Sequence, residues 1–161
     1  MVPAPSPMCF LEGTQISTPE GSRPIETLKV GDYVNLPNGK NLKIIFIGKQ
    51  IFDLNDAPEA HPVSFAPNSI APGVPSSNLN LSAQHGVWNG HDWYLASQLV
   101  NNESIKEMEN PPTIINFYNI ELEEWAAVLA ENLACESYRD LRNRNEFHYS
   151  TKVNGESLAL A

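Results

Sequence analysis

The chain has 161 residues, of which 42% are hydrophobic and 18% charged, and its formal net charge at pH 7 is −9. This composition is typical of a folded domain with a hydrophobic core and excludes a largely disordered chain. The acidic balance argues against nucleic acid as a partner, because no basic stripe is present to displace counterions from phosphates. No apolar run approaches the ~20 residues of a membrane span, and no stretch has the pattern of a signal peptide.

The amino-terminal residues predict an extended arm followed by short strands. Residues 1–8 contain three prolines at alternate positions, which favour an extended, polyproline-like conformation. Residues 15–18 are expected to form a strand. Residues 24–28 show a weak alternation of apolar and polar side chains, which predicts a second strand.

A hairpin is the clearest local prediction. The β-prone runs 33–36 and 42–47 flank Pro37-Asn38-Gly39. Asn-Gly between such runs is a strong hairpin signal, because both residues accept a positive φ. We expect the second strand to end at Gly48.

Residues 53–78 contain five prolines and are expected to form a long loop, which in a compact domain is often functional. Asp53, Asp56 and Glu59 lie in this run, but they lack the fixed spacing of convergent metal ligands. We therefore expect no metal site and no cofactor.

Strand signals return after this loop. We expect a strand at 79–81, a hairpin formed by 87–88 and 93–94, one or two helical turns within 94–100, and a strand at 113–122. The last of these is rich in Ile, Phe and Tyr, which favour β-structure.

Two residues suggest nucleophilic chemistry. Cys9 precedes Phe10-Leu11-Glu12-Gly13-Thr14, and His85 ends the run Leu81-Ser82-Ala83-Gln84-His85. An imidazole can remove the proton of a thiol, and the thiolate can then attack a carbonyl carbon. The alternatives are that Cys9 is an ordinary small hydrophobic residue and that His85 is structural.

Four segments, in order along the chain, extend this pattern. They are Cys9-Phe10-Leu11-Glu12-Gly13-Thr14-Gln15-Ile16, Gly21-Ser22-Arg23-Pro24-Ile25-Glu26-Thr27-Leu28-Lys29-Val30-Gly31-Asp32-Tyr33-Val34, Leu79-Asn80-Leu81-Ser82-Ala83-Gln84-His85 and Phe117-Tyr118-Asn119-Ile120-Glu121-Leu122. Together they resemble the Hint domain, the self-processing module of hedgehog proteins and inteins, and above all its bacterial hedgehog/intein-like group. The resemblance implies a mainly β Hint fold, a compact, pseudo-two-fold, horseshoe-like domain over residues 9–137, with the long Pro-rich loop. Residues 1–8 would then be a passenger arm and residues 138–161 a carboxy-terminal tail.

The resemblance also implies an N–S acyl shift at the Met8–Cys9 bond. Cys9 would attack the carbonyl carbon of Met8, His85 would protonate the leaving nitrogen, and Ser82 is a candidate donor to the oxyanion. Ser82 capping its own backbone is the alternative. Water, a thiol or another nucleophile would resolve the thioester. The expected partner is the chain's own amino-terminal segment, and the domain is expected to act as a monomer.

The end of the pattern departs from inteins, which close on His-Asn before a nucleophile. Glu136 and Ser137 occupy those places, and Ser137 has no side-chain amide with which to cyclise. We therefore expect cleavage without splicing. Asn119 stands where many inteins have Asp, and Trp125 where His is common, so the activation of Cys9 is left open.

Residues 121–144 support two interpretations. Their apolar residues fit a 3.6-residue period, which predicts an amphipathic helix, whereas the resemblance implies two short strands with a turn at Glu131-Asn132. We adopt the strands, and we expect the tail after Ser137 to be helical or disordered. Cys135 would then lie near the site, either as a buried residue or as a second thiol able to oxidise with Cys9.

Three functions compete on this evidence. The leading hypothesis is a single-turnover, autocatalytic, cysteine-dependent cleavage, which is not enzymatic turnover in the usual sense. The others are an inactive Hint-fold interaction module and a cysteine hydrolase that acts in trans with Cys9 and His85. Localisation is left open, although a nucleophilic Cys9 favours a compartment in which thiols stay reduced.

Overall fold

The computed structural model describes residues 8–139, 149–151 and 157–159. These residues form a mainly β fold, as the sequence predicted. The strands are β1 (Phe10–Leu11), β2 (Gln15–Thr18), β3 (Gly21–Pro24), β4 (Tyr33–Asn35), β5 (Asn41–Asp53), β6 (Val63–Phe65), β7 (Leu79–Leu81), β8 (Gly86–Trp88), β9 (Trp93–Leu95), β10 (Ile105–Glu107), β11 (Ile114–Leu122), β12 (Ala127–Ala130), β13 (Leu133–Glu136), β14 (Tyr149–Thr151) and β15 (Ser157–Ala159). Three short 3-10 helices complete the described elements, namely η1 (Ile25–Thr27), η2 (Pro58–Ala60) and η3 (Ala96–Leu99).

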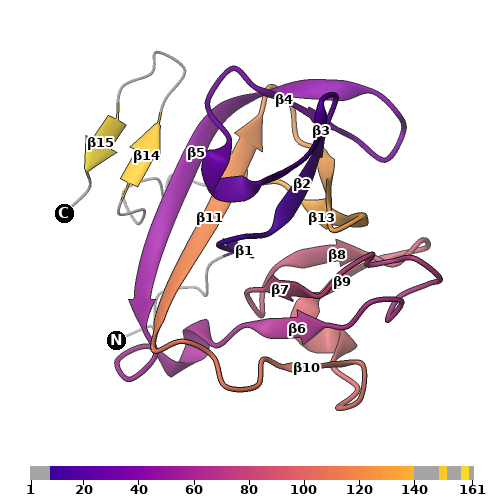
Figure 1. Ribbon diagram of the computed structural model, residues 1–161, viewed down its shortest axis with the longest axis vertical. Coiled ribbons are helices and arrows are strands. Elements are labelled where there is room, and N and C mark those ends of the chain that lie inside the picture. The colour runs from indigo at the N-terminus through magenta and orange to yellow at the C-terminus, as the bar shows by residue number, and fades with distance from the viewer. Residues whose placement is uncertain (1–7, 140–148, 152–156, 160–161) are drawn as a thin grey trace.

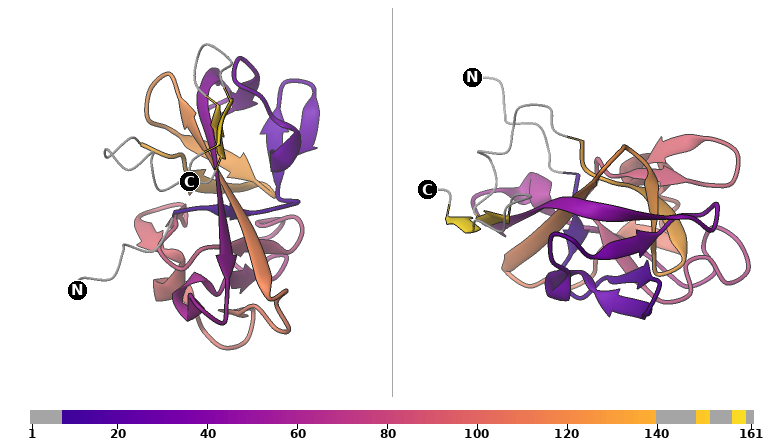
Figure 2. Two further views of the ribbon diagram at one scale, coloured as in Figure 1. Left: turned by 90° about the vertical axis from the view of Figure 1, so that its left-hand side faces the viewer. Right: turned by 90° about the horizontal axis from the view of Figure 1, so that it is seen from above.

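The described strands form two antiparallel sheets. The larger has the order β10-β6-β7-β1-β11-β5-β14-β15, with β4 paired to β5, and the smaller has the order β3-β2-β12-β13-β8-β9. The long pair β5 and β11 runs along one side of the molecule (Figure 1). Strand β1 crosses the middle, between an upper group that contains β2, β3 and β4 and a lower group that contains β6 and β7 (Figures 1 and 2). The first strand is therefore central to the fold.

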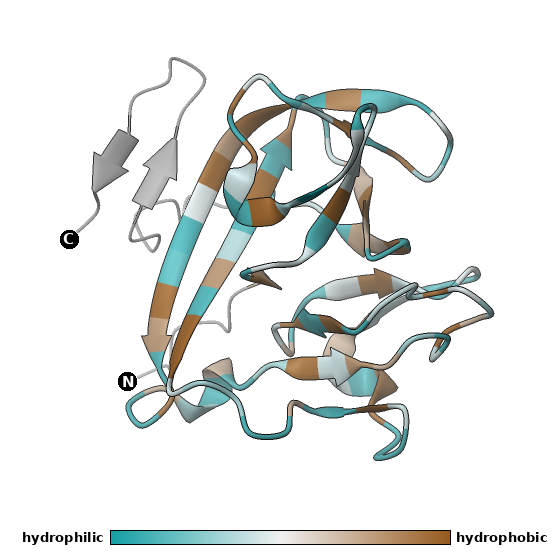
Figure 3. Ribbon diagram, viewed as in Figure 1, coloured by the Kyte–Doolittle hydropathy of each residue, from teal (hydrophilic) through white to brown (hydrophobic). Residues whose placement is uncertain are grey.

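Strand β5 is built by alternation of buried and exposed side chains. Along the ribbon, the apolar and polar residues of this strand fall in short stretches (Figure 3). Burial, in contrast, alternates, with Ile44, Phe46, Gly48 and Gln50 buried on one face while their neighbours are more exposed. The period of two is that of a strand with one face against a core. The prediction that this strand ends at Gly48 is wrong, because Gly48 lies in the buried phase opposite Asn119 and pairing with β11 continues to Asp53.

The predicted hairpin is confirmed. Strands β4 and β5 pair antiparallel, and Gly39 adopts a φ of 85° in the connection, a conformation that glycine accepts without strain. The strand predicted at 15–18 is confirmed as β2.

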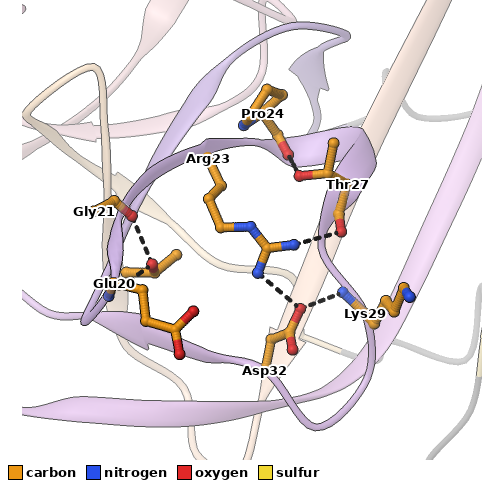
Figure 4. Close-up of polar contacts among 8 residues, drawn as sticks. Glu20, Gly21, Arg23, Pro24, Thr27, Lys29 and Asp32 are labelled. Carbon is orange, nitrogen blue, oxygen red and sulfur yellow. Dashed lines mark hydrogen bonds and ion pairs between the residues drawn. The ribbon is translucent and has the colours of Figure 1, made fainter.

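The strand predicted at 24–28 is wrong, because β3 ends at Pro24 and the 3-10 helix η1 follows. The reason is a local network of polar contacts (Figure 4). The guanidinium of Arg23 donates to the carbonyl oxygen of Thr27 at 3.0 Å and pairs with Asp32 at 3.5 Å, and the Asp32 carboxylate accepts the backbone N–H of Lys29. These bonds favour a compact turn over an extended strand.

The middle of the chain is more regular than predicted. The expected loop at 53–78 contains η2 and the strand β6, which pairs with β7 and β10. The prediction missed β6 because it is only three residues long and has a proline on each side, at 62 and 67. The predicted strands at 79–81 and 113–122, the hairpin of β8 and β9, and the helical turn η3 are all confirmed.

Residues 121–138 contain the end of β11 and the strands β12 and β13, so the helix predicted by their apolar period does not exist there. Strands β12 and β13 pair antiparallel around Glu131 and Asn132, whose φ values are 46° and 68°. Positive φ at both central residues is the geometry of a two-residue hairpin turn. The expectation of a helical or disordered tail fails at β14 and β15, whose backbones are extended, and elsewhere after Arg139 it lies outside the described residues.

Candidate active site

Strand register brings the start of β1, the end of β7 and the middle of β11 together. Phe10 lies opposite Leu81 of β7 on one side and opposite Tyr118 of β11 on the other. Both pairings are antiparallel, so the residue before Phe10 faces the residue after each of these partners. Cys9 therefore comes to lie between Ser82 and Asn119.

Asn119 contacts the carbonyl group of the Met8–Cys9 peptide bond. Its Nδ2 donates a hydrogen bond to the carbonyl oxygen of Met8, while its Oδ1 accepts the backbone N–H of Ile120 at 3.0 Å. The two partners fix the orientation of the amide, because only its nitrogen can donate to a carbonyl. An ionised aspartate at this position could not make that bond, so the Asn found where many inteins have Asp supplies a donor.

Ser82 contacts the other end of the same peptide bond. Its hydroxyl oxygen accepts the backbone N–H of Cys9 at 2.7 Å, and its own N–H donates to the carbonyl oxygen of Cys9 at 3.0 Å. The sequence suggested Ser82 as a donor to the Met8 oxygen. In the structure it is Asn119 that donates there, and Ser82 lies at the amide nitrogen.

The thiol of Cys9 is buried and protonated in the resting structure. Cys9 is 1% exposed and its Sγ donates a weak hydrogen bond to Oε1 of Gln50 at 3.5 Å. Burial raises the pKa of this thiol above its ordinary value, because the thiolate loses its hydration. A base is therefore needed before this sulfur can attack. Sequence reasoning missed Gln50, although a polar residue in the buried phase of β5 was a usable signal.

His85 is fully buried and neutral at pH 7. A turn through residues 83 and 84, closed by the bond from its N–H to the Ser82 carbonyl, directs it back toward β1, where its ring packs 4.3 Å from that of Phe10. Its Nε2 lies 2.8 Å from the carbonyl oxygen of Glu136, and because a carbonyl only accepts, Nε2 carries the hydrogen. Burial lowers the pKa of His85 to about 4, although the hydrogen bond to the Glu136 backbone and the nearby backbone of Cys9 oppose this shift.

The second ring nitrogen of His85 is available for proton transfer. Nδ1 is buried, and none of the residues that the structure describes is a hydrogen-bond partner for it. In the tautomer fixed by Glu136 it carries a free lone pair. Nδ1 is therefore the ring nitrogen at which His85 could accept a proton, and the lowered pKa means that burial opposes this protonation.

The residues at the carboxy-terminal end of the site are buried but make fewer polar contacts. The Ser137 side chain is fully buried, and its Oγ accepts a long hydrogen bond of 3.5 Å from the N–H of Ala126.

Cys135 lies in β13 opposite Val87, and both cysteines are free thiols. Among the described residues no group of three or more His, Cys, Asp or Glu side chains could hold a metal ion, and Asp53, Asp56 and Glu59 form no such group.

Comparison with known proteins agrees with this architecture. The chain is similar in structure to the gp41-1 intein (TM-score 0.58, 14% identity, 81% of this chain and 98% of the other). It is also similar to a bacterial intein-like domain from Clostridium thermocellum (TM-score 0.57, 14% identity, 82% and 99%) and to the MchDnaB-1 intein (TM-score 0.56, 11% identity, 80% and 99%). The fold is therefore that of inteins and intein-like domains.

A match to a family model identifies the family of this chain. The pattern that defines the Hint domain matches residues 8–142, and the chain belongs to this family of self-processing domains. No curated protein is similar in sequence. Within the part of the chain that the structure describes, no helix is long and apolar enough to cross a membrane.

Proposed function

We propose that this Hint domain cleaves its own chain at the Met8–Cys9 bond by an N–S acyl shift. The observation that supports this proposal is that both ends of one peptide bond are hydrogen-bonded by side chains from separate segments, one within β11 and one directly after β7. Asn119 donates to the carbonyl oxygen of Met8, and Ser82 accepts from the amide nitrogen of Cys9. Cys9, which contributes this nitrogen, also carries the candidate nucleophile, its thiol.

The reaction begins with proton transfer and attack. Nδ1 of His85 takes the thiol proton of Cys9, and Sγ forms a bond with the carbonyl carbon of Met8. The carbonyl electrons move to the oxygen, where Asn119 already donates a hydrogen bond. A donor at such an oxyanion typically contributes about 10²–10³ in rate.

Collapse of the tetrahedral intermediate breaks the carbon–nitrogen bond. His85 returns the proton to the nitrogen of Cys9, which leaves as an amine, and a thioester joins Met8 to Sγ. Ser82 supports this step, because an acceptor on the N–H favours positive charge at the leaving nitrogen. Proton transfer of this kind typically contributes about 10²–10⁴ in rate. Water, a thiol or another nucleophile then attacks the thioester carbonyl and releases the Cys9 sulfur.

Burial of the nucleophile favours this intramolecular reaction over hydrolysis in trans. The 1% exposure of Cys9 leaves an external peptide no access to Sγ, whereas the Met8 carbonyl is covalently adjacent. One copy of the chain is sufficient. Splicing is not part of the proposal, because Ser137 has no amide nitrogen that could attack its own carbonyl.

The test is a fusion with a reporter protein before Met8 and a different one after residue 161, incubated with a small thiol or with hydroxylamine. We expect release of an amino-terminal fragment that ends at Met8, as a thioester or a hydroxamate, identified by mass. Cys9→Ala should abolish this release. Cys135→Ala is the matched control, since it removes the other buried thiol and should leave release intact. Cleavage of the Cys9→Ala fusion at the same bond, or an unaltered wild-type fusion, would overturn the proposal.

A further inference from the structure

The three tryptophans of the chain form one partly exposed aromatic cluster. Trp88 and Trp93 face each other across the β8–β9 hairpin with ring centroids 5.6 Å apart, and Trp125, in the turn before β12, lies 5.6 Å from Trp93. Trp93 is 40% exposed and Trp125 is 43% exposed. Two neighbouring indoles left in water are unusual, because each could bury a large apolar area.

These indoles line a hollow of about 290 Å³ together with Tyr94, Leu95, Gln98 and Glu136. Glu136 is the acidic residue among the lining residues, and none of them is basic. Gly86 leaves room for the carboxylate, because a Cβ at that position would collide with it. The hollow therefore combines aromatic faces with one partly buried negative group.

Both features favour a positive ligand. Burial raises the pKa of Glu136, which means that the carboxylate is short of solvation, and the Trp125 indole and Arg139 only partly compensate. Aromatic faces attract cations through their quadrupole, and the chain itself uses this interaction, with the guanidinium of Arg139 5.5 Å from the centre of the Trp125 ring. The net charge of −9 attracts cations over a longer range.

We propose that Trp93, Trp125 and Glu136 form a binding site for an organic cation of the alkylammonium or guanidinium class. The volume is sufficient for a ligand the size of a lysine or arginine side chain. The site adjoins the candidate active site through Glu136, whose backbone carbonyl accepts the hydrogen bond from His85 while its carboxylate lines the hollow. The proposal does not depend on the acyl shift.

Intrinsic fluorescence tests this directly, because every tryptophan of the chain belongs to the cluster. The full-length Cys9→Ala protein, in which the proposed cleavage cannot interfere, would be titrated at constant ionic strength with butylammonium, methylguanidinium and tetramethylammonium chlorides. Neutral butanol is the isosteric control. We expect a saturable change with the cations and none with butanol.

Two variants make the test specific. Glu136→Gln keeps the shape of the side chain and should weaken binding at least about fivefold, by loss of the charge, whereas the exposed Glu124→Gln should not. Trp125→Leu should weaken binding to a similar extent by removing the ring. A response that does not saturate, that butanol reproduces, or that Glu136→Gln and Glu124→Gln diminish equally would overturn the proposal.

Discussion

The two ends of the Hint domain are equipped very differently. At the amino-terminal end, Asn119 and Ser82 bond to the two sides of the Met8–Cys9 peptide, and the ring of His85 packs against the next residue, Phe10. At the carboxy-terminal end, Ser137 is equally buried, yet within the described part of the chain its hydroxyl makes only a long bond to the backbone of Ala126. One end has side chains directed at the atoms of a peptide bond, and the other has side chains that complete a fold. The comparison teaches that burial near the candidate nucleophile does not by itself direct a side chain at a peptide bond.

The largest effect is expected from His85→Ala, since no other group in the site can carry the proton to the leaving nitrogen. Thiol-induced release at Met8 should slow at least about 100-fold, measured as the rate of fragment formation. The matched control is His61→Ala, because His61 also bonds a backbone carbonyl, that of Met108, but lies outside the site. An unchanged rate in a well-folded His85→Ala protein would remove this residue from the mechanism.

Asn119→Asp tests the donor at the Met8 oxygen. The change is nearly isosteric but replaces a donor by a carboxylate, so release should slow about 10²–10³-fold, and Asn119→Ala should behave similarly. Asn116→Ala, on the same strand and facing Glu12, should leave the rate unchanged. Faster release in Asn119→Asp would show that an acidic partner is needed here, as in the inteins that carry Asp.

The pKa of His85 predicts how stability depends on pH. The pKa falls from an ordinary value of 6.5 to about 4 on folding, so between these values the unfolded chain binds a proton that the folded chain does not. Stability is therefore fully present above pH 6.5 and is lost as the pH falls toward 4, at about 1.4 kcal/mol per pH unit. Denaturant unfolding of the Cys9→Ala protein should show a free energy of unfolding about 2 kcal/mol lower at pH 5 than at pH 7. His85→Gln should remove most of that dependence, and an equal dependence in both proteins would contradict the assignment.

The smallest effect is expected at the other end of the domain. Ser137→Ala should change the rate of amino-terminal release by less than about twofold, and the carboxy-terminal reporter should stay attached in both proteins. Restoring the intein residues with Glu136→His and Ser137→Asn would sharpen the comparison if carboxy-terminal cleavage then appeared. A ligated product of the two reporters from the unaltered chain, seen by mass spectrometry, would refute the distinction between the ends.

Local signals in the sequence predicted most strands but not their limits. Asn38-Gly39 predicted the hairpin of β4 and β5 correctly because the conformation of the turn depends on these two residues alone. The end of β5 was predicted wrongly because the sequence around a glycine looks the same whether the glycine lies inside a strand or at its end. The two cases differ in the pairing with β11, where Asn119 lies opposite Gly48. The helical period in 121–144 arose because two strands with a period of two meet at a two-residue turn, and the exposure of Trp125 shows that no single apolar face exists.

The residues of the candidate site could be proposed from the sequence, but their contacts could not. Cys9 and His85 could be selected from their motifs, because the chemistry requires those side chains. The contacts of Asn119, Ser82 and Gln50 depend on the register of β1 between its neighbours and on amide orientation, which are properties of the folded sheet. No local pattern in the sequence predicts these contacts.

The hydrogen bond between Met8 and Asn119 spans 111 residues, so it can form only after most of the domain has been synthesised. Met8 leaves the ribosome long before Asn119 is made, and β11, which carries Asn119, must also pair with β1 before the bond can form. At a synthesis rate of 5–20 residues per second, the interval is about 6–22 seconds. During that time any protein joined ahead of Met8 stays tethered to the growing chain and can fold there. On the proposed mechanism, the length of the domain itself times the release of whatever precedes it.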